Sequence, residues 1–187
     1  MKQVIILVLL LFAFNFSYGQ RGPNSNVFQP GFSVGVSGGG MFPIAKFSDE
    51  AEPGGGGNFS MVYNCTPHWS AFSDITYNAL PNPGSTTFYV TGVVGSRYNF
   101  PLAPIKSSVF IEAGAGAYNF RVDQDSATSG LTFPDVSQIQ AGVNLGIGGN
   151  LYMNELMDFF FKTNIHQTLF RNERSMVTAF GGFKFKF

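Results

Sequence analysis

A period-two alternation runs through most of this 187-residue chain, and it limits the possible folds more than any other feature. In residues 138–153, QIQAGVNLGIGGNLYM, one set of alternate positions is apolar or glycine, and the other is small or polar. Successive side chains of a β-strand point to opposite faces, so this pattern predicts a strand with one apolar face. Beyond the N-terminal apolar run, no segment has the i, i+3, i+4 spacing of an amphipathic helix at convincing length.

The same alternation predicts eight strands. Gly, Pro, Asn, Asp and Ser cluster between them, as they do in turns. Connections near 66–69, 101–106 and 153–157 are expected to be short, and those near 43–56, 79–86, 121–137 and 171–174 mostly longer. Alternating short and long connections are typical of an up-and-down membrane barrel. The predicted strands cover residues 31–42, 57–66, 69–79, 87–100, 107–120, 138–153, 157–170 and 175–187.

Two kinds of eight-stranded barrel would show this alternation. A soluble, lipocalin-like barrel turns its apolar face inward and carries a charged exterior, whereas a membrane barrel turns its apolar face to lipid. The polar faces here are rich in Gly, Asn, Ser and Thr, and charged residues make up only 12% of the chain. Such faces suit a narrow lumen filled by side chains better than a surface exposed to water. The sequence therefore favours an all-β, eight-stranded antiparallel up-and-down transmembrane β-barrel.

The N-terminal segment has the pattern of a secretory signal peptide. Lys2 precedes an apolar run over residues 4–16, and Ser17 and Gly19 are the small residues of a cleavage site. A membrane anchor is the weaker alternative, because a spanning helix needs about 20 apolar residues. Export followed by barrel formation predicts an integral protein of the outer membrane. The expected division is a signal peptide at 1–19, an N-terminal extension at 20–30 and the barrel at 31–187.

The last seven residues, GGFKFKF, alternate Phe183, Phe185 and Phe187 with Lys184 and Lys186. We expect a closing strand with its aromatic side chains toward lipid and its lysines toward the lumen. A strand that ends on Phe resembles the C-terminal signature by which bacterial outer-membrane barrels are recognised for insertion. The predicted barrel as a whole resembles the small outer-membrane barrels of the OmpA and OmpW types of Gram-negative bacteria.

That resemblance implies outer-membrane lipid and the barrel-insertion machinery as partners, and a monomeric state, but it assigns no activity. OmpA-type proteins carry a peptidoglycan-binding domain after the barrel. Because this sequence ends with the barrel, we do not expect a role in anchoring the cell wall.

Charged residues inside the predicted strands fall on the lumen face. The expected hairpins would place Arg97 opposite Glu112 and Asp158 opposite Lys186. Opposite charges across a strand pair attract each other, and ions at membrane depth need partners. We therefore expect a structural network of ion pairs that fills the lumen, with a gated polar path as the alternative. The network comprises Asp74, Arg97, Glu112, Asp158, Lys162, Lys184 and Lys186.

The histidines offer little support for catalysis. Small outer-membrane lipid A deacylases carry a His-x-Ser pair on a late strand, to which His166 and Thr168 are similar in passing. Here Thr replaces the nucleophilic Ser, and the following strand has no acid that would orient the histidine. His68 is expected in a solvated turn. We predict no catalytic residue, and a lipid-modifying enzyme is a remote alternative.

The sequence indicates neither a metal site nor a cofactor. Asp123 and Asp125 resemble the start of a calcium loop, but Pro134 stands where the bidentate Glu should be. The acidic, glycine-rich segment 48–57 is expected to be a solvated external loop, with weak cation or partner binding as the alternative. The chain contains 11 acidic and 11 basic residues, so no basic face for nucleic acid is predicted.

Aromatic residues near strand ends are expected to form interfacial girdles. Cys65 is expected to be buried on the apolar face near one rim. The functional prediction is a non-enzymatic barrel whose external loops serve structural or partner contacts, with the partner unknown. A transport barrel for small or hydrophobic solutes is the alternative. The expected girdle residues are Tyr63, Trp69, Tyr98, Phe100, Phe159, Phe161 and Phe187 on one rim, and Tyr77 and Phe88 on the other.

Overall fold

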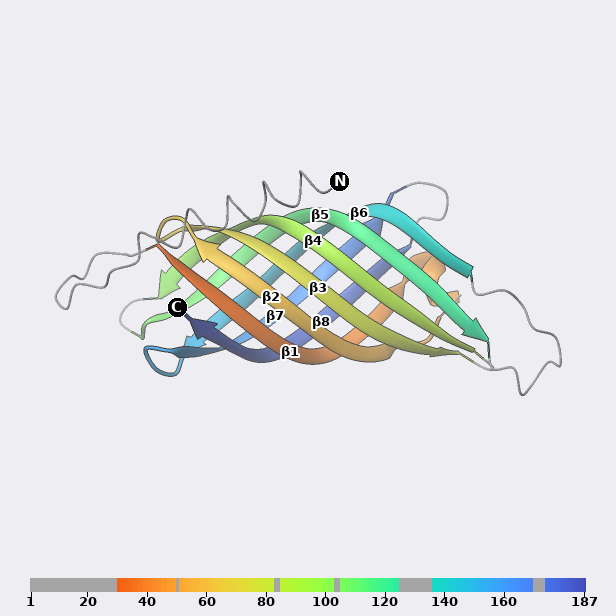
Figure 1. Ribbon diagram of the computed structural model, residues 1–187, viewed down its shortest axis with the longest axis horizontal. Helices are drawn as coiled ribbons and strands as arrows, with labels where there is room; N and C mark the ends of the chain where they lie inside the picture. Colours follow the sequence, from red (N-terminus) through yellow and green to blue (C-terminus); the bar gives the residue numbers. More distant parts are fainter. Residues whose placement is uncertain (1–29, 50, 83–84, 103–104, 125–135, 170–173) are drawn as a thin grey trace, which may run out of the picture.

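The computed structural model describes residues 30–49, 51–82, 85–102, 105–124, 136–169 and 174–187. Each strand pairs antiparallel with its neighbour in sequence, and β1 also pairs with β8, so the sheet closes on itself (Figure 1). This architecture confirms the predicted all-β, eight-stranded up-and-down barrel. Its elements are β1 (Gly31–Ile44), the 3₁₀ helix η2 (Ala45–Asp49), β2 (Gly54–Asn64), β3 (Trp69–Asn82), β4 (Ser85–Leu102), β5 (Ser107–Gln124), β6 (Val136–Tyr152), β7 (Met157–Thr168) and β8 (Ser175–Lys186).

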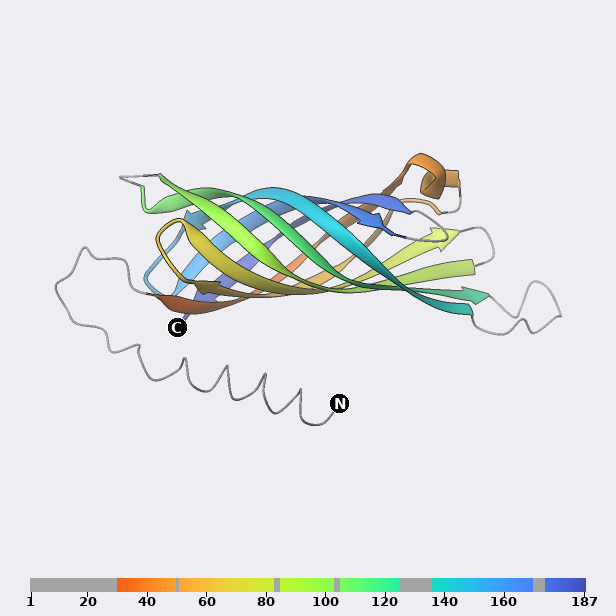
Figure 2. The same ribbon diagram turned by 90° about the horizontal axis from the view of Figure 1, so that it is seen from above.

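The two ends of the barrel differ in what they carry. At one end, which we call the terminus end, β1 begins, β8 ends, and the β2–β3, β4–β5 and β6–β7 turns lie. The opposite end, which we call the loop end, carries η2 and the remaining connections. Figure 2 shows the C-terminus and η2 at opposite ends of the tilted strands.

The barrel wall is apolar outside and largely polar inside, as the alternation predicts. On β6, the side chains of Ile139 and Leu145 are 72% and 66% exposed, whereas Asn144 between them is 2% exposed. An outer wall of this kind suits hydrocarbon, and closure pairs every strand edge, as a membrane-spanning sheet requires. In the described part of the chain, no helix has the length and apolar character needed to cross a membrane.

The loop end differs from expectation at the β3–β4 connection. A longer loop was predicted near 79–86, but the strand pairing continues to Asn82 and Ser85. Leu80 lies on this extension of β3 and is fully buried. The alternation between lumen-facing and outward-facing side chains therefore continues along the extension. β5 likewise continues to Gln124, and these strands project at the loop end in Figure 1.

The expectation of a buried Cys65 is wrong. β2 ends at Asn64, and Cys65 opens the turn to β3, where its side chain is exposed. The backbone N–H groups of Cys65 and Thr66 both donate to the carbonyl of Trp69, at 2.9 and 3.0 Å. The Thr66 hydroxyl accepts the N–H of Trp69 at 2.9 Å, which closes the turn.

The expected signal peptide at 1–19 and most of the extension at 20–30 lie outside the described residues. The division of the chain into these segments therefore stays a prediction.

Candidate functional site in the barrel lumen

All seven charged residues assigned to the lumen face lie inside the barrel or at its terminus-end mouth. Six are buried, and Lys186 is partly exposed. Each carboxylate among them lies within ion-pair distance of a cation. The seven residues are Asp74, Arg97, Glu112, Asp158, Lys162, Lys184 and Lys186.

The first ion pair joins neighbouring strands. Arg97 on β4 and Glu112 on β5 are direct partners in the register, as the expected hairpin requires. Nε and Nη2 of Arg97 donate to Oε2 of Glu112 at 3.0 and 2.6 Å. The guanidinium also lies 3.8 Å from the ring centroid of Phe110 and 5.6 Å from that of Phe72. Charge-assisted hydrogen bonds and ring stacking together suit arginine better than lysine at this position.

A second ion pair crosses the lumen. Nζ of Lys162 on β7 lies 2.5 Å from Oδ2 of Asp74 on β3, and the two side chains are 2% and 4% exposed. β3 and β7 are not adjacent in the barrel. The pair therefore forms a brace between opposite walls of the barrel. The pairing of neighbouring strands alone cannot predict this contact.

The third group of charged residues, Asp158 with Lys184 and Lys186, has a different register from the one expected. Asp158 is opposite Lys184, not Lys186, because the pairing of Gln167 with Ser175 centres the hairpin one residue earlier than expected. A one-residue change in the hairpin centre moves partners by two residues, which keeps every side chain on its face. Lys186 still reaches the carboxylate diagonally at 2.8 Å, and Lys184 lies 3.7 Å from it. Asp158 thus has two lysine neighbours.

The half of the lumen nearer the loop end holds a large apolar and aromatic group beside buried polar side chains such as Asn78 and Thr168, and the expected polar filling did not include this group. Its residues pack in one buried cluster in which the rings of Tyr89 and Phe120 lie 4.8 Å apart. A closed lumen excludes water from these side chains, so they pack as a protein core does. We call this group the loop-end plug: Met41, Phe47, Leu80, Tyr89, Tyr118, Phe120 and Met176.

The 3₁₀ helix contributes to this plug. Phe47 of η2 is 2% exposed, and its ring lies edge-on to that of Phe120 at 5.7 Å. The guanidinium of Arg174 lies over both rings, 5.4 Å from Phe47 and 4.5 Å from Phe120. Tyr89 and Phe120 occupy lumen positions of the alternation, so part of the plug was visible in the sequence. Phe47 belongs to no strand and could not be placed in this way.

Buried polar groups without partners lie between the ion pairs and the plug and, in the case of Tyr89, within the plug itself. Among the described residues, both polar atoms of the Asn144 side chain and Oδ1 of Asn164 accept or donate no hydrogen bond. The same holds for the hydroxyls of Tyr89 and Thr91 and for the amide of Gln140. Because native structures rarely leave buried polar atoms unpaired, this layer stands out from the rest of the lumen.

His166 lies in this part of the lumen without a catalytic arrangement. Its ring nitrogens lie 3.2 Å from the Tyr118 hydroxyl and 3.1 Å from the Thr178 hydroxyl, and the residue is 4% exposed. Thr168 bonds to the backbone of Arg174, whose N–H donates to its hydroxyl at 2.8 Å. In the part of the chain that the structure describes, His166 and Thr168 therefore do not form the oriented base and accessible hydroxyl nucleophile that nucleophilic catalysis requires.

The loop segments considered for cation binding lie partly outside the described residues. Most of the calcium-loop resemblance at 123–134 falls outside the described residues, as does Glu50. Among the described residues, no group of three or more His, Cys, Asp or Glu side chains could hold a metal ion. His68 is exposed in the β2–β3 turn, where it was expected.

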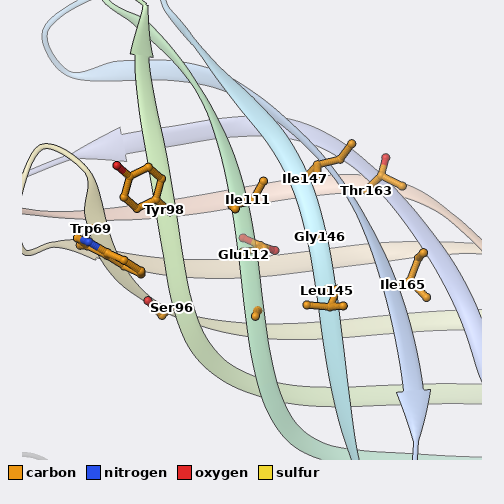
Figure 3. A pocket seen from close by; sticks show the side chains of 11 residues that line it. Trp69, Ser96, Tyr98, Ile111, Glu112, Leu145, Gly146, Ile147, Thr163 and Ile165 are labelled. Carbon is orange, nitrogen blue, oxygen red and sulfur yellow. The ribbon is translucent and has the colours of Figure 1, made fainter.

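Aromatic side chains line the outer wall near both rims. The ring of Tyr98 lies 5.0 Å from that of Trp69 and 4.9 Å from that of Phe100, and Tyr77 stacks on Phe88 at the other rim at 5.9 Å. A groove of about 480 Å³ lies in this outer wall. Figure 3 shows its lining, with Trp69 and Tyr98 on one side and Leu145, Ile147 and Ile165 on the other. Its exposed apolar walls fit a lipid-facing surface.

A closed barrel with an apolar outer wall and a charge-paired lumen defines a small integral membrane β-barrel. No protein-family model matches the sequence, and no curated protein matches it. Solved structures of outer-membrane barrels do match the fold. Neisserial surface protein A, NspA, aligns with a TM-score of 0.68 at 13% identity, covering 83% of this chain and 97% of that one.

Two further solved structures of outer-membrane barrels also align with this chain. The N-terminal β-barrel domain of Pseudomonas aeruginosa OprF aligns with a TM-score of 0.52 at 17% identity, covering 85% of this chain and 100% of that one. Ail, the attachment invasion locus protein of Yersinia pestis, aligns with a TM-score of 0.53 at 13% identity, covering 84% and 97%. Identities this low establish the fold alone. The chain has the fold of the small eight-stranded outer-membrane barrels, and its outer wall is that of an integral outer-membrane protein.

Proposed function

We propose that this chain is a non-enzymatic outer-membrane barrel whose lumen is closed to solutes and whose loop end makes the contacts with external partners. The observation that carries the proposal is the presence of two different barriers in series along the lumen. Ion pairs close the half nearer the terminus end, and the loop-end plug closes the other half.

Each barrier is costly to open. Separating Lys162 from Asp74 leaves two unpaired ions in a site shielded from water, which costs several kcal/mol. Opening the loop-end plug exposes packed aromatic and aliphatic side chains such as Tyr89 and Leu80, which are fully buried. A solute that crosses the lumen would have to open both barriers, so spontaneous conduction should be rare.

The absence of an enzymatic role is supported by the surroundings of His166. Its contacts to Tyr118 and Thr178 are those of a side chain that fills a core, and the residue is only 4% exposed. A lipid-modifying enzyme would instead need its reactive group at the barrel surface, where lipid can reach it.

We further infer that the terminus end faces the periplasm and the loop end faces outward. Short turns lie at the terminus end, as in bacterial outer-membrane barrels generally. Phe183 and Phe185 are exposed on the outer wall of β8, and Phe187, which follows the strand, is also exposed, so the insertion machinery can contact all three before the barrel closes. We also propose that this C-terminal segment is recognised for insertion and that the barrel is monomeric.

Conductance across a planar lipid bilayer tests the closed lumen. We expect no single-channel steps from the unmodified barrel, and none after removal of one barrier alone. Steps should appear in a combined variant that carries Asp74→Ala and Lys162→Ala together with Phe47→Ala and Phe120→Ala. Ile139→Ala, on the outer wall, is the matched control and should stay silent. Reproducible steps from the unmodified protein would refute the proposal.

One observation favours a transport barrel as the second candidate. The buried amides of Asn144 and Gln140 lack partners among the described residues and lie on the lumen face of β6. Such groups can offer hydrogen bonds to a small polar solute that enters the lumen. Steady conductance in the unmodified barrel that falls when Asn144 is changed to Leu would support this candidate.

A further inference from the structure

A polar pocket of about 160 Å³ opens at the terminus end of the lumen. Its wall combines side chains from several strands and turns that are far apart in the sequence. Neither the closed lumen nor the loop-end contacts requires such a pocket. The residues used below are Asn64, Arg97, Lys106, Asn150, Asp158 and Lys184.

We propose that this terminus-end pocket binds a small oxyanion of the phosphate class. The first argument is the balance of charge. Arg97 is matched by Glu112, but Lys184 and Lys186 share the single carboxylate of Asp158, at 3.7 and 2.8 Å. One positive charge at the mouth therefore has no lumen carboxylate of its own. The buried Lys184 also donates to the side-chain oxygen of Asn150 at 2.7 Å, and a bound anion would supply the second negative charge that the two lysines lack.

The second argument is the supply of hydrogen-bond donors. Arg97 uses Nε and Nη2 for Glu112, and among the described residues its Nη1 has no partner. Asn64 accepts a hydrogen bond from Ser70 through Oδ1 at 2.7 Å, and its Nδ2 likewise has no partner in the described part of the chain. Both residues line the pocket. Guanidinium and amide N–H groups that converge on one space are the usual ligands of phosphate oxygens.

The third argument is the gathering of cations around this mouth. Lys106 and Lys186 both lie over the ring of Tyr152, with Nζ 4.9 and 4.8 Å from its centroid. Lys106 also bonds to Glu155 at 3.3 Å, a contact that raises the pKa of this lysine. The hydrogen bond from the Tyr152 hydroxyl, followed by that from Lys106, lowers the pKa of Glu155. Lys106 thus stays charged at the edge of the pocket.

The position of the pocket decides which oxyanion can reach it. The pocket lies inside the ring of strands, with Lys184 and Asp158 from the lumen faces of β8 and β7, whereas lipid contacts the outer wall. A volume of 160 Å³ is far above the minimum of about 10–15 Å³ that a water molecule needs, but too small for a polymer. We therefore assign a free oxyanion from the aqueous side, not the phosphate of a lipid headgroup. The inference does not depend on the closed lumen.

Inorganic phosphate is the probe for this site. The full barrel should be folded in a maltoside detergent, which contains no phosphate, and titrated by isothermal calorimetry at constant ionic strength with chloride as the competing salt. We expect saturable binding that Lys184→Met weakens by at least about tenfold, because one charge-assisted hydrogen bond is lost. Lys46→Met, which removes an equivalent charge from an exposed position of η2 at the loop end, should leave the affinity unchanged.

A second variant separates binding from a loss of structure. Asp158→Asn removes the carboxylate that Lys184 and Lys186 share, and it should tighten phosphate binding severalfold. A merely damaged pocket cannot bind its ligand more tightly. The proposal is overturned if the unmodified barrel shows no saturable binding, if Lys184→Met and Lys46→Met behave alike, or if Asp158→Asn fails to tighten binding. Binding that appears only in phospholipid nanodiscs, without added phosphate, would identify a lipid headgroup instead and also overturn it.

Discussion

The brace between Lys162 and Asp74 gives a direct test of how the lumen is held together. Nζ and Oδ2 lie 2.5 Å apart across the lumen, and the side chains are 2% and 4% exposed. Removing one partner leaves the other charge buried without compensation. From such burial we expect Asp74→Ala or Lys162→Met alone to lower the free energy of unfolding by about 3–5 kcal/mol.

The double variant should be far less damaged than the sum of the single variants. With both charges gone, only the lost hydrogen bond and a small cavity remain, so its stability should lie within about 2 kcal/mol of the unmodified barrel. The interaction free energy between Asp74 and Lys162 would then be at least about 4 kcal/mol, above the range of about 0.5–3 kcal/mol that is usual for coupled neighbours.

Equilibrium unfolding by urea in lipid vesicles measures these differences. Trp69 is the only tryptophan of the chain and reports on the rim of the barrel. The matched control is the ion pair of Lys106 and Glu155, whose side chains are 64% and 74% exposed. Lys106→Met and Glu155→Gln should have no measurable effect, because water screens exposed pairs. Equal effects at both pairs, or a double variant as unstable as the two single variants combined, would refute the reasoning.

Three further predictions test the wall, the orientation and the C-terminal strand. A Cβ at Gly39 would collide with the backbone of β8, whereas one at Gly38 would meet only the carbonyl oxygen of Gly56 at an ordinary contact distance of 3.8 Å, so only Gly39→Ala should lower the urea midpoint. Cys65 should react with an impermeant maleimide only after the outer membrane is opened. Ser48→Cys in a Cys65→Ala background should react on intact cells, and the reverse pattern would contradict the orientation. Phe187→Ala should reduce the amount of folded barrel in the membrane without changing its urea midpoint, and normal assembly would argue against the recognition role.

The strands of this barrel could be predicted because their pattern is local. In β6 each side chain faces lipid or lumen according to its parity, so Leu145 and Asn144 could be assigned without a partner strand. The same parity placed the seven lumen charges on the correct face. The register within a hairpin was predicted less accurately. Arg97 does pair with Glu112, whereas Asp158 pairs with Lys184, two residues before the predicted partner Lys186.

Features that depend on closure could not be predicted from the pattern. Lys162 meets Asp74 only because the sheet closes and brings β7 across from β3. Phe47 enters the loop-end plug because η2 turns inward, and a 3₁₀ segment has no period-two signal. Cys65 was misplaced because strand ends depend on turn hydrogen bonds, here those of Thr66 and Trp69.

The sequence by itself determined the number of strands, the two faces of the wall and the suitability of the outer face for lipid. These properties follow from an alternation that every strand carries independently of its neighbours. Tertiary structure alone decided that Lys162 meets Asp74 across the lumen, where the apolar plug lies and how the terminus-end pocket gathers its cations. Those contacts join side chains that are distant in the chain, and only the circumference and tilt of the closed sheet bring them within a few ångströms of each other.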